Sequence, residues 1–242
     1  MSHPALPLNA WMRWDHVQRL LPRLDIRTVL EIGAGGGAVA VRLAERYDYL
    51  GLEPDAESFA RAEARLRALG RGRILPIDTS RLDPGERFDL VCAFEVLEHV
   101  EDDLGALREW RAHIRDGGWL LLSMPAHERR FSAHDRVVGH YRRYDPAPTA
   151  ALLRLAGYSD PVVLMCGFPL GYALEIARNT IGRLHRPAES MEEQTAASGR
   201  WLQPPDQLGW LTAAIAAPFR LLQRPFAHSG FGTGLVVLAQ SR

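Results

Sequence analysis

Three histidines lie close together in one short polar segment, and histidine is the side chain best suited to move protons near neutral pH. Residues 127–144 contain His127, His134 and His140 together with two tyrosines. Asp135 directly follows His134, and an adjacent carboxylate can orient an imidazole or favour its charged form. The pattern predicts general base catalysis with His134 and Asp135 as the first choice, His140 as the second and His127 as the third.

Two other interpretations of this segment stay open at the level of sequence. It could be a loop that packs on itself through salt bridges, or it could close over a bound cofactor. Polar and aromatic residues at this density are hard to explain as core, and loops held by a rigid scaffold often carry chemistry. We therefore favour a functional role.

A glycine-rich stretch is the strongest sign of a ligand-binding element. Residues 29–37 read VLEIGAGGG, an apolar run that ends in alternating glycines, and residues 38–47 have an amphipathic helical pattern. Glycine permits the backbone angles of a tight turn, and it lets a ligand approach the main chain. The spacing fits more than one cofactor pattern, so the turn predicts a nucleotide-like ligand without choosing which one.

Carboxylates follow the next two predicted strands. The strand at 49–53 ends in Glu53, twenty residues after Gly33, which is the position that reaches ribose hydroxyls in such units. The strand at 73–77 is followed by Asp78. Open α/β sheets bind ligands at the carboxyl ends of their strands, so both acids are predicted to face the ligand.

Composition narrows the function class. The 242 residues include 29 basic and 29 acidic side chains, with no lysine, so no basic surface for nucleic acid is predicted. Cys92 and Cys166 lie in predicted strands outside any Cys-x-x-Cys pair, and no metal site is predicted. The first residues lack the charged and apolar regions of a secretory signal, which predicts a cytoplasmic protein.

Five segments in order resemble the class I S-adenosylmethionine-dependent methyltransferases, in particular their small-molecule branch. They read VLEIGAGGG, LGLEPD, ILPIDTS, FDLVCAFEVLEHV and DGGWLLLSMP. The resemblance covers residues 27–168 and returns at 232–240. It implies a doubly wound, Rossmann-like α/β sheet of seven strands with an antiparallel last strand, and S-adenosyl-L-methionine as the cofactor.

The resemblance also implies roles for individual residues. Glu31 would support the methionine amino end of the cofactor, Glu53 would hold both ribose hydroxyls, and Asp78 would address the adenine amine. A helix-start role remains open for Glu98 and His99. The full cofactor-binding set that the resemblance implies is Glu31, Gly33, Ala34, Gly35, Gly37, Glu53, Pro54, Asp78, Thr79, Phe94, Glu95 and His99.

The chain order predicts three parts. Residues 1–24 form an N-terminal helix, residues 25–168 with 230–242 form the cofactor-binding core, and residues 169–229 form a helical insertion between strands six and seven. Helices are expected at 172–184 and at 208–222, the second interrupted by Pro218. The apolar run 208–219 is too short to span a bilayer. A lid over the acceptor pocket, a contact between two copies of the chain and an interfacial membrane anchor remain open as its use.

The sequence therefore predicts a methyltransferase that moves a methyl group to an oxygen or nitrogen atom of a small, largely apolar metabolite by in-line displacement. Its partner is a small-molecule acceptor and not a nucleic acid. Two alternatives are a cofactor-binding regulator or membrane-associated subunit without turnover, and an NAD-dependent oxidoreductase. The acceptor, the attacking atom and the oligomeric state are left open.

Overall fold

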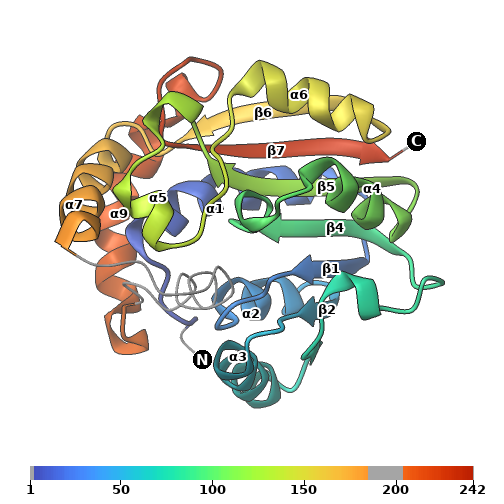
Figure 1. Cartoon of the computed structure of the whole chain (residues 1–242). Helices are drawn as coiled ribbons and strands as arrows, with labels where there is room; N and C mark the ends of the chain where they lie inside the picture. The colour runs from blue at the N-terminus through green and yellow to red at the C-terminus, as the bar shows by residue number, and fades with distance from the viewer. Residues whose placement is uncertain (1–2, 185–203, 242) are drawn as a thin grey trace.

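One mixed sheet forms the centre of the molecule. The computed structural model describes residues 3–184 and 204–241, and its strands have the order β3-β2-β1-β4-β5-β7-β6. Strand β7 runs antiparallel to β5 and β6, which confirms the predicted seven-stranded sheet with an antiparallel last strand (Figure 1). The strands are β1 (Thr28–Ile32), β2 (Asp48–Leu52), β3 (Arg73–Leu75), β4 (Phe88–Phe94), β5 (Ile114–Pro125), β6 (Tyr158–Cys166) and β7 (Gly234–Ser241).

Helices cover both faces of the sheet, and this explains why the central strands are apolar without alternation. In β1, Leu30 is buried in the core on the side of α4 and α6, while its neighbour Val29 is buried in the core on the side of α1, α2 and α3. The helices are α1 (Leu8–Leu20), α2 (Ala38–Ala44), α3 (Ala56–Leu69), α4 (Asp103–Ala112), α5 (Ala133–Val137), α6 (Pro146–Leu155), α7 (Leu170–Leu184) and α9 (Gly209–Leu222).

One strand and one helix continue through a proline. Strand β6 begins at Tyr158, ahead of Pro161, and its register with β7 shifts between Ser159 and Val162. Such an irregularity accommodates a proline, which has no N–H to give to the ladder. Helix α9 continues through Pro218 instead of stopping there. Its packing against α1 outweighs the local preference of proline.

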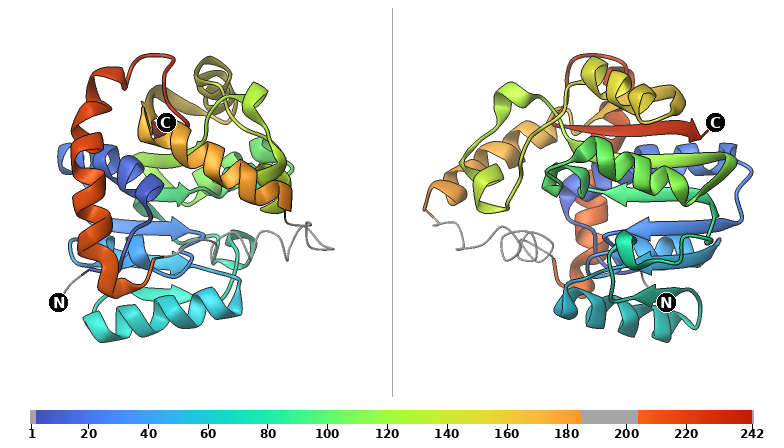
Figure 2. Two further views of the ribbon diagram at one scale, coloured as in Figure 1. Left: turned by 90° about the vertical axis from the view of Figure 1, so that its left-hand side faces the viewer. Right: turned by 45° about the vertical axis from the view of Figure 1, so that its right-hand side comes forward.

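Helices α7 and α9 both lie between β6 and β7 in the chain, but they take different positions. Helix α7 packs against α5, and α9 packs against α1. Figure 2 shows them as two separate helices, α7 in light orange and α9 in dark orange. No helix among the described residues is long and apolar enough to cross a membrane. Trp210 and Leu221 on α9 are 72% and 61% exposed, and a dimer or membrane contact of this helix stays a prediction.

Candidate functional site

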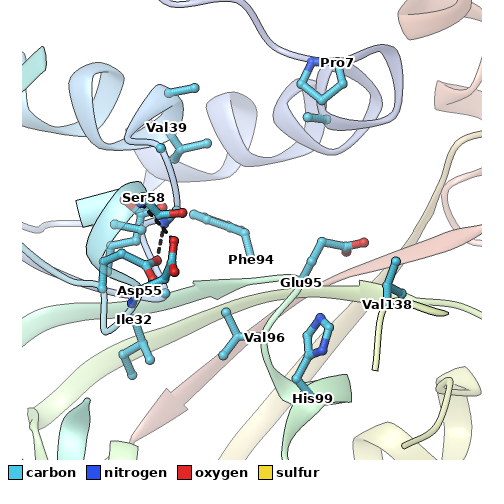
Figure 3. Close-up of a pocket in the computed structure, with 18 of the residues that line it drawn as sticks. Pro7, Ile32, Val39, Asp55, Ser58, Phe94, Glu95, Val96, His99 and Val138 are labelled. Carbon is cyan, nitrogen blue, oxygen red and sulfur yellow. Dashed lines mark hydrogen bonds between the residues drawn. The ribbon is translucent and has the colours of Figure 1, made fainter. Parts of the chain in front are cut away.

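A large pocket lies at the carboxyl ends of β1, β2 and β4, with a volume of about 1740 Å³. Figure 3 shows Phe94 in its middle, with Asp55 and Ser58 on one side and Glu95 and His99 on the other. The pocket lining includes every predicted cofactor residue except Gly37, namely Glu31, Gly33, Ala34, Gly35, Glu53, Pro54, Asp78, Thr79, Phe94, Glu95 and His99.

The glycine turn after β1 has the backbone that the sequence predicted. Gly33 and Gly35 have φ angles of 69° and 53°, in the left-handed region that favours glycine. A Cβ at Gly33 would lie 2.6 Å from a methyl group of Val96, whereas a Cβ at Gly35 would meet nothing within 4 Å. The turn thus needs glycine for its shape, and at Gly35 it leaves the main chain open to a ligand.

Gly37 lies outside the pocket lining and packs between two helices. It is the N-cap of α2, with a φ of 78°, and a Cβ there would lie 2.8 Å from the Cα of Ala62 in α3. The missing side chain lets α2 and α3 pack closely. Gly37 therefore shapes the turn from behind and does not line the pocket.

The Glu53 carboxylate lies at the end of β2 and contacts the glycine turn. It accepts hydrogen bonds from the backbone N–H of Gly35 at 2.7 Å and of Asp55 at 2.9 Å. Burial raises the pKa of this carboxyl above its usual value, and the two N–H donors oppose that rise. The predicted ribose acceptor thus lies at the end of β2, anchored to the glycine turn.

Removing this carboxylate should weaken cofactor binding. We expect Glu53→Ala to lower the affinity for S-adenosylhomocysteine at least about tenfold, since a hydrogen bond to a charged group contributes about 1.5–3 kcal/mol. Calorimetric titration measures this. Glu57→Ala is a matched control, because Glu57 lies outside the pocket lining and pairs with Arg61 on the surface of α3. Equal affinity of Glu53→Ala and wild type would contradict the assignment.

Glu31 is more deeply buried than the sequence suggested. It is 2% exposed, and its carboxyl accepts a hydrogen bond from the Tyr49 hydroxyl at 2.5 Å. Burial raises the pKa of Glu31 to about 8. The group lines the pocket, so a cationic amino group placed beside it would favour its ionised form.

The other predicted cofactor contacts form two regions of the wall. Asp78 is exposed and accepts a hydrogen bond from Ser80, while Thr79 is buried. On the opposite side Glu95 lies 3.4 Å from the Arg13 guanidinium of α1. Sequence reasoning missed Arg13 and also Arg178 of α7, which both line the pocket. An arginine on an amphipathic helix carries no sequence sign that distinguishes a pocket from solvent.

His134 is placed in the pocket wall by the packing of α7 on α5. Ser132 hydrogen-bonds Asn179 at 2.6 Å, and a Cβ at Gly182 would lie 3.0 Å from the Cα of His134. Asn179 and Gly182, three residues apart, share the face of α7 that holds this segment. Burial, together with the nearby positive charge of Arg178, lowers the pKa of His134 to about 4. His134 is therefore a neutral imidazole at physiological pH.

Asp135 does not pair with His134, which corrects the prediction from sequence adjacency. It is fully buried and accepts hydrogen bonds from Nδ1 of His140 at 2.8 Å and from Nε and a terminal nitrogen of Arg143 at 2.8 Å. Burial alone would raise the pKa of Asp135, but these donors hold it well below its usual range. Neighbours on a helix point in different directions, so the carboxylate reaches inward while His134 reaches the pocket.

Residues 127–144 therefore do contain salt bridges, as one interpretation of this segment predicted. Arg143 also binds Glu175 of α7, which in turn binds Arg130. His127 lies 3.4 Å from Asp145 and is not among the residues that line the large pocket. His134 and His140 do line the large pocket. Of the three histidines proposed as bases, the fold thus directs two to the site.

A second group of side chains lies beside His140. Glu98, His99 and His140 bring their ligand atoms within 4.8 Å of one another. The rings of His99 and His140 meet edge to face, with centroids 4.7 Å apart, and burial lowers the pKa of His99 to about 3. The sequence predicted no metal site, because these three residues come from two separate segments.

Known proteins match this chain over the same region. The family described as "Methyltransferase domain" matches residues 30–120, from β1 into β5. A probable S-adenosylmethionine-dependent methyltransferase of Mycobacterium tuberculosis is 28% identical over 220 residues, which is 88% of this chain and 77% of that protein. The chain carries a class I S-adenosylmethionine-dependent methyltransferase domain.

Other similarities of this methyltransferase domain are partial or concern the fold. A ubiquinone biosynthesis O-methyltransferase of Bordetella avium is 31% identical over 48% of this chain, and the match spans about half (51%) of that relative's length. An N-methyltransferase of Bradyrhizobium japonicum in complex with S-adenosylhomocysteine has a TM-score of 0.56 at 17% identity, covering 96% of this chain and 88% of that one. A possible histamine N-methyltransferase of Thermotoga maritima has a TM-score of 0.60 at 17% identity, with coverages of 97% and 91%.

The pocket fits the cofactor of this domain, S-adenosylmethionine. The open space beside the Gly35 main chain lets a ligand approach the turn closely. The Glu53 carboxylate at the end of β2 can accept hydrogen bonds from hydroxyl groups of that ligand. Glu31 and Glu95 are acids on the side that a cationic methionine end would take. The observed turn and acids thus suit both ends of the ligand.

Proposed function

We propose that this methyltransferase acts on an oxygen or nitrogen atom of a small molecule with a largely apolar body. The observation that carries the proposal is a single pocket that runs from the glycine turn to His134 and His140. A donor bound at the turn and an acceptor bound at the histidines would share this space. In-line transfer requires only that the two reacting atoms be aligned and that water be excluded.

Helix α7 supplies the apolar part of the acceptor wall. Leu174, Ala177 and Ile181 line the pocket, and their spacing of three or four residues places them on one helix face. Arg178 lines the same wall and can bind a polar or anionic group of the acceptor. The acceptor class that fits this wall has an apolar body with one polar end.

His134 is the proposed proton acceptor. The sulfonium of S-adenosylmethionine supplies an activated methyl group. A neutral imidazole in the wall can accept a hydrogen bond from the attacking group and then take its proton. An attacking hydroxyl becomes strongly acidic as its new bond to carbon forms, so even a weakly basic imidazole can remove the proton late in the step. The low pKa of His134 therefore suits an oxygen acceptor best.

Charge supports a small molecule over a nucleic acid as the acceptor. The basic and acidic side chains balance at 29 each, whereas nucleic-acid binding relies on a basic surface that neutralises phosphates. Some curated relatives are tRNA U34 carboxymethyltransferases of Shewanella, matched over 46% of this chain. RNA is therefore the comparison to include in the assay.

Transfer of a radiolabelled methyl group tests the proposal. We expect label from S-adenosylmethionine to enter a low-molecular-weight product when the protein is incubated with a metabolite extract. Glu53→Ala should transfer less at limiting cofactor. Label in the RNA fraction alone would contradict a small-molecule acceptor. Binding of S-adenosylhomocysteine without any transfer would favour the non-catalytic alternative.

A further inference from the structure

We propose that Glu98, His99 and His140 bind a divalent transition-metal ion of the zinc class on the acceptor side of the pocket. Two segments bring these residues together. Glu98 and His99 lie in the short 3-10 helix after β4, Leu97–His99, and His140 follows α5. One ligand atom from each residue lies within 4.8 Å of those of the other two.

The first observation concerns the buried carboxylate of Glu98. Its residue is 0% exposed, and neither carboxylate oxygen has a hydrogen-bond partner among the residues that the structure describes. Nε2 of His140 lies 3.9 Å from Oε1, beyond hydrogen-bond distance. A buried carboxylate without a partner is costly, and such groups are usually paired or bound to metal. A cation between Glu98 and the imidazoles would satisfy it.

The outer nitrogens of both histidines are the second, independent observation. Nδ1 of His99 lies 3.1 Å from the carbonyl oxygen of Gly139, and Nδ1 of His140 lies 2.8 Å from Asp135. Both partners are acceptors, so each Nδ1 carries the hydrogen and each Nε2 presents a lone pair. Histidines that bind metal almost always donate their other N–H to a carbonyl or carboxylate in this way.

The donor set selects the class of metal. Two imidazoles and one carboxylate suit zinc and related first-row metals, whereas magnesium and calcium prefer oxygen ligands throughout. Donors at about 2.0–2.2 Å from a tetrahedral zinc ion lie about 3.3 Å apart. The three ligand atoms now lie within 4.8 Å of one another, so they would have to move closer together to bind one ion. Three protein ligands also leave a fourth position, as catalytic zinc sites do.

That fourth position would face the acceptor. His99 and His140 line the large pocket, whereas Glu98 is buried behind them. An acceptor hydroxyl bound to the metal would lose its proton more readily, because the cation stabilises the resulting oxygen anion. The oxygen would form its bond to the methyl carbon as the bond from that carbon to sulfur breaks, and His134 would take the hydroxyl proton as the new bond forms. This role in acceptor activation rests on the proposed function, but metal binding itself does not.

Direct metal titration tests the site without any acceptor. The tag-free chain is dialysed against a chelator and titrated with Zn²⁺ by calorimetry, and with Co²⁺ by visible absorption. We expect one ion per chain, and at least about tenfold weaker binding in Glu98→Gln and His99→Ala. His127→Ala is the matched control and should bind as wild type does, because His127 pairs with Asp145 away from the pocket.

Thermal unfolding distinguishes a variant that has lost metal binding from a variant that does not fold. Zn²⁺ should raise the Tm of the wild type and of His127→Ala but not that of Glu98→Gln. The absence of one-to-one binding in the wild type, or equal affinity in Glu98→Gln, would overturn the site. Unchanged methyl transfer after chelation would overturn the acceptor role alone. Metal binding in a protein that transfers no methyl group would instead count against the proposed function.

Discussion

Replacing His134 with alanine is expected to lower turnover about 10²–10⁴-fold while the affinity for the cofactor stays nearly unchanged. The residue lies in the pocket wall at α5, and its low pKa keeps the imidazole neutral. Loss of the proton acceptor would therefore slow the transfer step, and it would leave the glycine turn and Glu53 in place. Turnover is measured with the labelled methyl donor, and affinity by calorimetric titration of S-adenosylhomocysteine.

The pH profile gives a second measurement on the same residue. Because the folded pKa of His134 is lowered to about 4, the base form is present above that pH and is lost as the pH falls through it. Turnover should thus show no step from His134 between about pH 6 and pH 8, where an ordinary histidine titrates. His127→Ala should keep wild-type turnover. A collapse of cofactor affinity in His134→Ala would show instead that the segment clamps the cofactor.

Replacing Asp135 with alanine is expected to destabilise the fold by about 3–5 kcal/mol, the usual result of removing one partner from a buried ion pair. Arg143 is 6% exposed and would lose the two hydrogen bonds that it now gives to Asp135. His140 and the Ser132 cap of α5 would lose their acceptor as well. Urea unfolding followed by circular dichroism measures the change in the free energy of unfolding.

A substitution of a surface carboxylate shows how much stability is lost when only a helix cap is removed. Asp102 caps α4 through a hydrogen bond from the N–H of Gly105, and Asp102→Ala should cost only about 0.5–2 kcal/mol. Equal destabilisation by the two substitutions would contradict a central role for Asp135. In that case Glu175 alone would hold Arg143.

Local sequence was enough to predict the cofactor half of the site. The turn at Gly33 and Gly35 and the acid Glu53 lie on consecutive strands of one unit, and parallel strands bring their carboxyl ends to one edge. Apolar runs and glycine angles are properties of short segments, so they can be read before the fold is known. The sheet, its antiparallel last strand and the cofactor class were implied by the resemblance of these segments, in their order, to the class I S-adenosylmethionine-dependent methyltransferases.

Only the tertiary structure decided the acceptor half. Adjacency in the chain paired His134 with Asp135, but a helix turns about 100° per residue, so the buried carboxylate meets His140 and Arg143 instead. The approach of Glu98 to His140, and the places of Arg13 and Arg178 in the wall, depend on how β4, α1, α5 and α7 pack. Contacts between segments far apart in the sequence leave no local pattern, because they are fixed by the packing of whole elements and not by the residues beside them.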